Sequence, residues 1–451
     1  MAGPAVRITG PDGNVLADVY CQFRRDGNTS WLVAMNMPTE HWRREARIRV
    51  RAVGAVEEWN CQSGTRYGVT ARRVGAGEVE ISCDFPPSGE HVYRIAPDPD
   101  LAQRLTDTLI TDQRRIELSG PFLFRLDEPN VVVLDRARFR LGDGGWQQET
   151  EILRVDKAVR LATGLAERGG EMVQPWFDAG RVSESKGTIE LEFSFEIEAM
   201  PAGLMELAIE HPGIFSMSLN GVGIVAPAQA DWWIDVCFKR VPLPPGLLRP
   251  GTNSLALKAD FHDGVNLEAV YLLGSFGVRL AGTRPVVIDL PGALRPGTLV
   301  NQGLPFYGGK LTCRLDPPTM PVEADERVFL EVPAFEAACL VVHQPGVEPR
   351  LIGWQPYEAE VTRAVSAGCP VELEIALTRR NTFGPLHQSP PEANGYGPWN
   401  FRTTSKTWSE SPNFYPAGLL APPVLTVRKM CPPLSPIFQT DPETLVQQPD
   451  R

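Results

Sequence analysis

An internal repeat restricts the fold of this chain more than any other feature of its sequence. One copy begins with LMELAIEHPGIFSMSLNGVG at residue 204, and the other begins with RVFLEVPAFEAACLVVHQPG at residue 327. Each copy has an apolar run, a turn with glycine, a run that carries tryptophan, a second turn and a final run of alternating apolar residues. Because an order this long seldom recurs by chance, we expect two copies of one jelly-roll-like sandwich.

Apolar runs of strand length fill most of the remaining chain. The 451 residues include 41 glycines and 42 prolines, which interrupt these runs at short intervals. Near the N-terminus, VLADVYCQFRRDGNTSWLVAMNM predicts two strands around a hairpin turn at Asp26-Gly27-Asn28. The pattern therefore predicts an all-β chain of tandem antiparallel β-sandwiches with one or two short linking helices.

Two helices are expected. Pro99 suits a first helical turn, and Leu101, Leu105 and Leu109 then repeat every four residues. The second stretch, EILRVDKAVRLATGLAERGG at 151–170, places apolar residues on one face and ends in two glycines. The expected units are a small β-sandwich over 1–97, a linker helix over 98–118, a first jelly roll with a helical insertion over 119–285, a second jelly roll over 286–430 and a flexible tail over 431–451.

Charge and hydropathy restrict the partners. The formal net charge of −11 makes nucleic acid and anionic membranes poor partners, since an acidic surface repels phosphate. No apolar run approaches the roughly 20 residues that a membrane helix needs, so no membrane association is expected. The N-terminus lacks a basic segment followed by an apolar one, and the eight cysteines form no Cys-x-x-Cys pair. We therefore expect a cytoplasmic, reducing location.

Metal and cofactor motifs are missing from the sequence. The six histidines are isolated, without the spacing of a zinc site, and there is no phosphate-binding glycine loop or Gly-x-Ser-x-Gly elbow. We therefore expect no cofactor and no transition-metal site. A structural calcium stays open, because its carbonyl and carboxylate ligands leave little trace in a sequence.

The candidate residues for contacting carbohydrate or another domain lie in the two repeats and just after the last repeated strand. They are Trp232, Trp233, Trp354, Tyr357, Arg379, Arg380, Asn381 and His387. Because adjacent residues of a strand point to opposite faces, one of the two neighbouring tryptophans should be buried and the other exposed.

The stretch LTRRNTFGPLHQ at 377–388 has three interpretations. Its polar side chains could contact sugar hydroxyls, clamp the aromatic-rich segment that follows, or dock onto a separate catalytic domain. At a strand end, one of Arg379 and Arg380 should pair with a carboxylate while the other faces outward. The clamp is the favoured interpretation.

The repeat resembles the ancillary β-sandwich modules of large glycoside hydrolases. LNGVG at 219–223 and RPGTN at 249–253 are similar to motifs in the galactose-binding-like jelly rolls of the β-galactosidase/β-glucuronidase group and the large α-L-rhamnosidases. VEEWNCQSG at 56–64 is similar to the small sandwich that follows the catalytic barrel in such enzymes. The resemblance implies C-terminal sandwich domains, two of them galactose-binding-like. The second copy departs from the motifs, with HQPGVEP and SAGCPVE.

In those families, the resemblance implies, a (β/α)₈ barrel supplies two catalytic carboxyl groups. With only two expected helices, this chain should lack that barrel, so no catalytic pair is assigned and the question of enzymatic activity stays open. We expect an accessory part of a glycoside hydrolase that binds carbohydrate or supports a separate catalytic barrel, alone or as a homo-oligomer. The alternatives are a self-sufficient hydrolase with an unrecognised site and a structural interaction protein without sugar binding. Carboxylates near the tryptophans, such as Asp231, Asp235, Glu268 and Glu358, are more often solvated or paired than catalytic.

Overall fold

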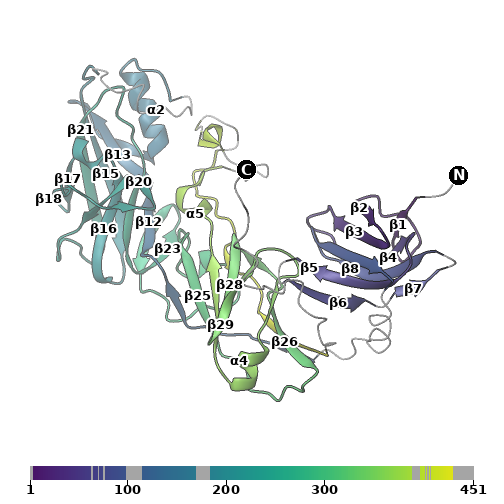
Figure 1. Cartoon of the computed structure of the whole chain (residues 1–451). Coiled ribbons are helices and arrows are strands. Elements are labelled where there is room, and N and C mark those ends of the chain that lie inside the picture. Colours follow the sequence, from purple (N-terminus) through teal and green to yellow (C-terminus); the bar gives the residue numbers. More distant parts are fainter. Residues whose placement is uncertain are drawn as a thin grey trace, which may run out of the picture.

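The computed structural model describes residues 4–61, 64–69, 71–74, 77–97, 114–168, 183–388, 397–401, 403, 406 and 408–429. Within these ranges the chain is almost entirely β-structure, arranged as three sandwiches with separate apolar cores (Figure 1). The pairings are antiparallel, apart from one parallel pair in the described part. The expected all-β fold of tandem antiparallel sandwiches is confirmed.

The N-terminal sandwich consists of two sheets. The first contains, in spatial order, β1 (Val6–Thr9), β4 (Arg43–Val50), β8 (Val79–Phe85) and β7 (Ala71–Arg73). The second contains β2 (Val19–Asp26), β3 (Thr29–Asn36), β9 (Glu90–Ala96), β5 (Ala55–Asn60) and β6 (Thr65–Val69). Asp26 pairs with Thr29, so the turn between them is the hairpin that the sequence predicts.

A second sandwich, the central roll, follows residue 130. One sheet contains β12 (Asn130–Leu134), β22 (Val270–Ser275), β16 (Ala202–Glu210), β20 (Asp235–Pro242) and β19 (Trp232–Trp233). The other contains β14 (Gln147–Glu151), β13 (Arg136–Leu141), β15 (Thr188–Ile197), β21 (Gly251–Asp260), β17 (Ser216–Leu219) and β18 (Val222–Ile224). Strands β23 (Gly277–Ala281) and β24 (Arg284–Ile288) join this sheet, with β24 parallel to β15.

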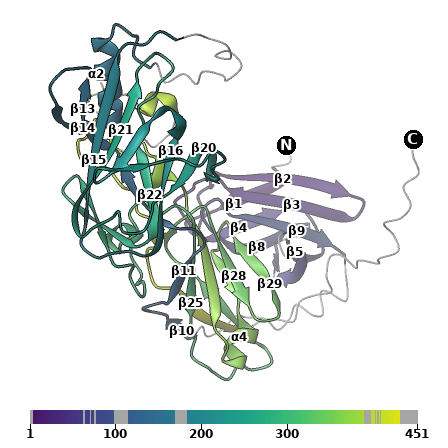
Figure 2. The ribbon, with the colours of Figure 1, turned by 90° about the vertical axis from the view of Figure 1, so that its left-hand side faces the viewer.

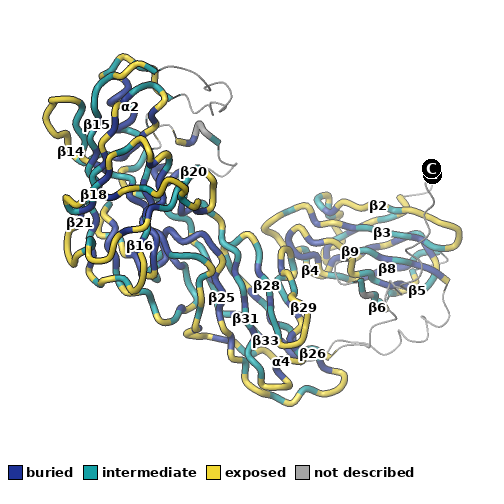
Figure 3. Tube along the Cα trace, turned by 60° about the vertical axis from the view of Figure 1, so that its left-hand side comes forward, coloured by how far each residue is buried: buried dark blue, intermediate teal, exposed yellow. Residues whose placement is uncertain are grey.

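Strand β15 illustrates why these residues form a sheet with one buried face. In TIELEFSFEI the apolar side chains alternate with polar ones, and the burial alternates in step. Phe193 and Phe195 are buried in the core, and each contributes about 1.5–3 kcal/mol on burial. Glu190 and Glu192 point to the other face, where they pair with Arg140 and Arg138 of β13. Figure 3 shows the buried residues concentrated inside the sandwiches.

The third sandwich, the C-terminal roll, also has two principal sheets. One contains β10 (Arg114–Glu117), β33 (Val424–Lys429), β26 (Glu326–Glu331) and β30 (Glu358–Glu360). The other contains β11 (Phe124–Leu126), β25 (Lys310–Leu315), β31 (Val371–Ala376), β28 (Cys339–Gln344) and β29 (Val347–Ile352). A small extra sheet pairs β27 (Phe335–Glu336) with β32 (Gly418–Leu419), and helix α4 (Thr362–Ala367) precedes β31.

The two rolls share one strand order. The series β12-β22-β16-β20 in the central roll corresponds to β10-β33-β26-β30 in the C-terminal roll. On the opposite face, β13-β15-β21-β17-β18 corresponds to β11-β25-β31-β28-β29. Both repeats contain a hairpin at the glycine turn, between β17 and β18 and between β28 and β29. The repeat in the sequence is therefore a repeat of topology as well.

The central roll interrupts the C-terminal roll in the sequence. Strands β10 and β11 come before it, yet they pair with β33 and β25, which come after it. Residues 119–126 therefore lie with the C-terminal roll, although the sequence places them in the first roll. Of the expected linker helix, residues 98–113 lie outside the described part, and Arg114–Glu117 forms β10. The expected tail 431–451 also lies outside it.

Helix α2 (Ile152–Ala162) confirms the second expected helix and packs beside β13 and β14 (Figure 2). Asp156, on its buried side, accepts hydrogen bonds from Arg160 Nε at 2.9 Å and Arg168 Nε at 3.0 Å. Its other oxygen accepts from the backbone N–H of Leu267 at 3.1 Å. This cluster ties the helix to the loop before β22. None of the described helices is long and apolar enough to cross a membrane.

Replacing Asp156 with alanine should destabilise the central roll by about 3–5 kcal/mol, because it leaves the buried guanidinium of Arg160 without its carboxylate. The measurement is urea unfolding followed by near-ultraviolet circular dichroism. The control is Glu198→Ala, which removes an ion pair that is exposed on both sides and should cost less than about 1 kcal/mol. Equal effects of the two substitutions would contradict this assignment.

Candidate functional site

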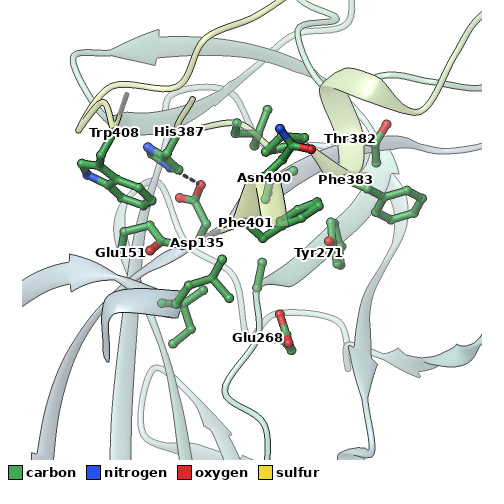
Figure 4. Close-up of a pocket in the computed structure, with 16 residues that line it drawn as sticks. Asp135, Glu151, Glu268, Tyr271, Thr382, Phe383, His387, Asn400, Phe401 and Trp408 are labelled. Carbon is green, nitrogen blue, oxygen red and sulfur yellow. Dashed lines mark hydrogen bonds and ion pairs between the residues drawn. The ribbon is translucent and has the colours of Figure 1, made fainter. Parts of the chain in front are cut away.

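A pocket lies where the chain leaves the C-terminal roll and returns to the central roll. We call residues 377–423, between β31 and β33, the return segment. The pocket has a cavity volume of about 80 Å³, and about 550 Å³ between its walls is not filled by protein atoms when the open mouth is included. Its walls come from the central roll and from the return segment, and its lining residues are Val133, Asp135, Glu151, Ile152, Leu153, Glu268, Ala269, Tyr271, Thr382, Phe383, Pro385, Leu386, His387, Asn400, Phe401 and Trp408 (Figure 4).

Phe383 anchors the return segment to the central roll. It ends the short helix α5 (Arg380–Phe383), and its ring stacks on Phe238 with centroids 5.3 Å apart. The edges of Tyr271 and Trp233 meet the same ring at 5.5 and 5.8 Å. Aromatic pairs of this kind contribute about 0.5–1.5 kcal/mol each beyond the area that they bury. This aromatic packing therefore holds the return segment on the central roll, together with Leu386 and Phe306, which are buried in the same core.

A buried ion pair lies beside this anchor. Nε2 of His387 is 3.0 Å from Oδ2 of Asp135, and Nδ1 is 2.7 Å from the carbonyl oxygen of Ser409 (Figure 4). Both partners are acceptors, so the imidazole satisfies them only when both of its nitrogens carry protons. Burial by itself lowers the pKa of His387, but the hydrogen bond and the charge of Asp135 outweigh it and raise that pKa. The geometry therefore favours the imidazolium form.

Glu151 is a buried carboxyl close to this pair. It is 3% exposed and caps α2, where its Oε2 accepts a hydrogen bond from the backbone N–H of Arg154 at 3.1 Å. Burial raises the pKa of Glu151 to about 7, and the negative charge of Asp135 adds to the effect. One wall of the pocket therefore holds a carboxyl that changes its protonation near neutral pH.

Trp408 closes the pocket on the side of the return segment. Its ring stacks on His387 with centroids 5.0 Å apart, and the Arg154 guanidinium lies 4.2 Å from its centroid. Its indole Nε1–H donates to Oε1 of Glu410 at 3.2 Å, and Glu410 also pairs with Arg136 and Arg154. These contacts fix the indole. By contrast, Phe401 is 41% exposed and offers an uncovered ring at the pocket wall.

The tryptophans of the repeats lie where the strand alternation predicts. Trp232 is 53% exposed and Trp233 is 3% exposed, which confirms that one faces outward and the other inward. Trp233 belongs to the aromatic cluster behind the pocket and does not line it. Trp354 is exposed, and Tyr357 packs edge-on against Phe335 at 4.7 Å. Neither Trp354 nor Tyr357 lines the pocket.

The polar stretch after β31 makes the contacts that the clamp interpretation predicts. Asn381 donates to the carbonyl oxygen of Tyr415 at 2.9 Å and accepts from its N–H at 3.0 Å. Nδ1 of His387 is hydrogen-bonded to the carbonyl oxygen of Ser409. Arg379 forms a bidentate pair with Glu128, with 2.8 Å between Nη2 and Oε2. These bonds tie the stretch to later residues of the return segment and to the loop before β12.

Arg380 corrects one expectation. The alternation of a strand predicts that it faces outward when Arg379 is paired. Instead, its guanidinium nitrogens are buried, and its Cζ lies 4.6 Å from the ring centroid of Tyr415. The physical reason is local: β31 ends at Ala376 and Arg380 begins α5, so the two arginines do not belong to a strand.

Sequence reasoning missed most of the pocket. Of the eight candidate residues, His387 is the one that lines it, and Glu268 stood among the carboxylates judged to be ordinary. Asp135, Glu151 and Tyr271 were not singled out. The signals were weak but present, since Asp135 follows the fully buried strand NVVVL and Glu151 directly precedes the first turn of α2.

The described residues contain no group of three or more His, Cys, Asp or Glu side chains that could hold a metal ion.

Comparison with known proteins gives remote structural neighbours. No protein-family model matches the sequence, and no curated protein is significantly similar to it. Among solved structures, a rhamnosidase from Novosphingobium sp. PP1Y aligns over 60% of this chain and 25% of its own, with 15% identity and a TM-score of 0.21. A glycosyl hydrolase family 2 member from Bacteroides cellulosilyticus DSM 14838 aligns over 55% of this chain and 32% of its own, with 11% identity and a TM-score of 0.20.

A xanthan lyase from Paenibacillus aligns over 96% of this chain and 36% of its own, with 11% identity and a TM-score of 0.14. This chain therefore spans about a third or less of the length of these three neighbours. Scores this low do not establish a common fold, so the chemistry of the pocket is inferred from its own residues.

The raised pKa of Glu151 predicts a pH dependence of stability. Its pKa is about 7 in the folded chain against an ordinary 4.5, so the folded state keeps a proton that the unfolded chain releases between these values. Stability should therefore fall as the pH rises from about 4.5 to 7, by about 3 kcal/mol from this group. Glu151→Gln should remove this pH-dependent part of the free energy of unfolding. The variant should therefore become more stable relative to wild type as the pH rises from about 4.5 to 7.

The measurement is urea unfolding at several pH values for wild type, Glu151→Gln and the control Glu167→Gln. Glu167 lies after the same helix with a 45% exposed side chain paired to Lys157, so its substitution should change the free energy of unfolding by less than about 1 kcal/mol over the same pH range. An equally small change for Glu151→Gln would contradict the assignment.

Proposed function

We propose that this chain is an accessory, carbohydrate-associated part of a glycoside hydrolase system, and that the pocket between the central roll and the return segment binds a sugar. The observation that carries the proposal is the combination of groups around one space. The exposed ring of Phe401 stands beside the carboxylates of Asp135 and Glu268 and the hydroxyl of Tyr271. Sugars present hydroxyl groups around an apolar ring face, which polar groups and an aromatic ring together recognise.

The repeated strand order supports the finer part of this proposal. Two rolls of one topology are what two galactose-binding-like modules would give, and the small N-terminal sandwich fits the module that follows a barrel in the families that the sequence resembles. The single parallel pairing in the described ranges, β15 with β24, is far from a barrel of eight parallel strands. The catalytic barrel would then be supplied by another polypeptide or another part of a longer one.

We divide the chain into a sandwich over 4–97, a central roll from β12 to β24, and a C-terminal roll that comprises β10, β11 and the residues from β25 to β33. In this division the pocket belongs to the boundary between the two rolls. A sugar bound there would contact both of them at once.

A second candidate function is hydrolysis of a glycoside in the pocket itself. Glu151, with a pKa of about 7, lies near Asp135. In glycoside hydrolases a protonated carboxyl acts as the general acid, and an ionised carboxylate nearby acts as the base or nucleophile. Against this, Asp135 is engaged by His387 and Glu151 caps α2. Binding without turnover is therefore the primary proposal.

Replacing Phe401 with alanine should weaken sugar binding about tenfold or more, because the sugar loses its apolar contact. The measurement is isothermal titration calorimetry with monosaccharides and oligosaccharides that a glycan array selects. Trp232→Ala is the matched control: that tryptophan is also exposed but does not line the pocket, so its loss should leave affinity unchanged.

If Trp232→Ala loses affinity and Phe401→Ala keeps it, the sugar binds at the exposed face of β19 and not in the pocket. No binding of any glycan would favour a structural role without sugar affinity.

A screen of nitrophenyl glycosides separates binding from hydrolysis. We expect no turnover above background by the chain alone. Turnover that disappears in both Asp135→Asn and Glu151→Gln, while circular dichroism shows each variant folded, would make the second candidate the correct one.

A further inference from the structure

A second cavity lies between the N-terminal sandwich and the C-terminal roll, and we call it the cleft. Its volume is about 840 Å³, within the range of roughly 300–1,000 Å³ common for ligand sites. Strands β5 and β9 and the adjoining loops of the sandwich form one wall, and strands β29 and β30 with the loop between them form the other (Figure 1 and Figure 3). Because the pocket beside the return segment has a cavity volume of about 80 Å³, the cleft can hold a considerably longer ligand.

Tryptophan side chains lie on both walls of the cleft. Of the ten tryptophans in the sequence, Trp42 and Trp59 line the cleft on the side of the sandwich, and Trp354 lines it on the side of the roll. Trp42 is 37% exposed and Trp354 is 45% exposed. A flat apolar ring can pack against the ring face of a sugar, so an indole on each wall suits a ligand made of several sugar rings.

The three indoles differ in the contacts that they already make. Nε1 of Trp59 donates to Oε2 of Glu57 at 3.1 Å, which fixes this ring in the sandwich. The Arg44 guanidinium lies 3.5 Å from the ring centroid of Trp42. Within the described part of the chain, the indole of Trp354 takes part in no hydrogen bond, ring contact or cation contact. The side chain of Trp354 is therefore available to a ligand.

The charged groups of the cleft are balanced, which favours a ligand without net charge. Four of its six carboxylates already pair with an arginine or a histidine, and they are Glu58, Asp84, Glu358 and Glu360. The other two, Glu90 and Glu348, are matched in number by Arg350 and Arg363 in the same lining. Because neither sign is in excess, the cleft gives no electrostatic advantage to an acidic or a basic chain. The amide of Gln355 adds donors and an acceptor for sugar hydroxyls.

We infer that the cleft binds a neutral oligosaccharide chain that contacts Trp42 on the sandwich and Trp354 on the C-terminal roll. This site goes beyond the sugar pocket of the proposed function and shares no lining residue with it. The ligand is a chain of sugars because the two rings belong to different walls of a large cavity. A chain bound in this way holds the sandwich and the roll together.

The test is isothermal titration calorimetry of the full chain with hexasaccharides of the cello, xylo and manno series and with their monosaccharides. The hexamers of galacturonic acid and of glucosamine are the acidic and basic probes. We expect at least one neutral hexasaccharide to bind about tenfold or more tightly than its monosaccharide, because only the longer ligand reaches both walls. Both charged hexamers should bind more weakly than this neutral hexasaccharide.

Four variants assign the binding to one site. Trp42→Ala and Trp354→Ala should each weaken hexasaccharide binding about tenfold or more, since each removes one of the two rings. Trp232→Ala is the matched control, because that exposed tryptophan lines neither the cleft nor the pocket, and it should leave affinity unchanged. Phe401→Ala alters the pocket and should also leave hexasaccharide affinity unchanged. Circular dichroism shows whether each variant is folded.

The outcomes separate this inference from the proposed function. Affinity that is lost in Phe401→Ala and kept in Trp42→Ala and Trp354→Ala overturns the inference and leaves sugar binding in the pocket. Affinity that is lost in both tryptophan variants, with no effect of Phe401→Ala on any sugar, supports the inference and contradicts the pocket. An effect of one tryptophan variant alone overturns the inference, because the ligand then does not span both walls. Preference for a charged hexamer, or no binding of any neutral hexasaccharide, also overturns it.

Discussion

The packing of Phe383 against Phe238, Tyr271 and Trp233 is the interaction on which the rest of the arrangement depends. Burying such a side chain contributes about 1.5–3 kcal/mol, to which the aromatic contacts add. The ion pair of His387 with Asp135 lies four residues further along and fixes the register of the return segment. The ion pair by itself adds little net stability, because its attraction must first offset the desolvation of both groups.

This interaction matters because of the path of the chain. The C-terminal roll starts before the central roll and is completed after it, so the two units are joined at β11 and β12, again after β24, and a third time by the return segment. The carboxylates of the pocket come from the central roll, and its amide and its exposed phenyl ring come from the return segment. Neither roll has the complete pocket, so its shape depends on the contact between them.

The parts of the fold that depend on local sequence could be predicted. The alternation in TIELEFSFEI, the turn at Asp26-Gly27-Asn28 and the apolar face of α2 each lie within a few residues of the contacts that they determine. The interruption of one roll by another could not be predicted in this way. Strand β10 has the sequence RRIE, which has no clear alternation, and its partner β33 is about 300 residues away.

The residues of the pocket likewise divide into those that local sequence indicates and those that it does not. His387 stood out because a polar cluster follows a clear strand, and it does reach the pocket. Its partner Asp135 is 252 residues distant, so no local pattern joins the two. Arg380 was misplaced because α5 has four residues, too few to interrupt the expected strand alternation visibly. The local sequence therefore indicates that the stretch at 377–388 makes clamping contacts. The residues that surround it in the pocket come together only in the tertiary structure.

The most direct measurement of the docked return segment is hydrogen–deuterium exchange in wild type and Phe383→Ala. The amides of Ser409 and Asn413 donate to the carbonyls of His387 and Leu386 within the return segment. If the aromatic contact holds this segment on the central roll, these amides should exchange faster in Phe383→Ala, while those of β31 and β33 keep their protection. Unchanged exchange at Ser409 and Asn413 in a folded Phe383→Ala chain would contradict the account.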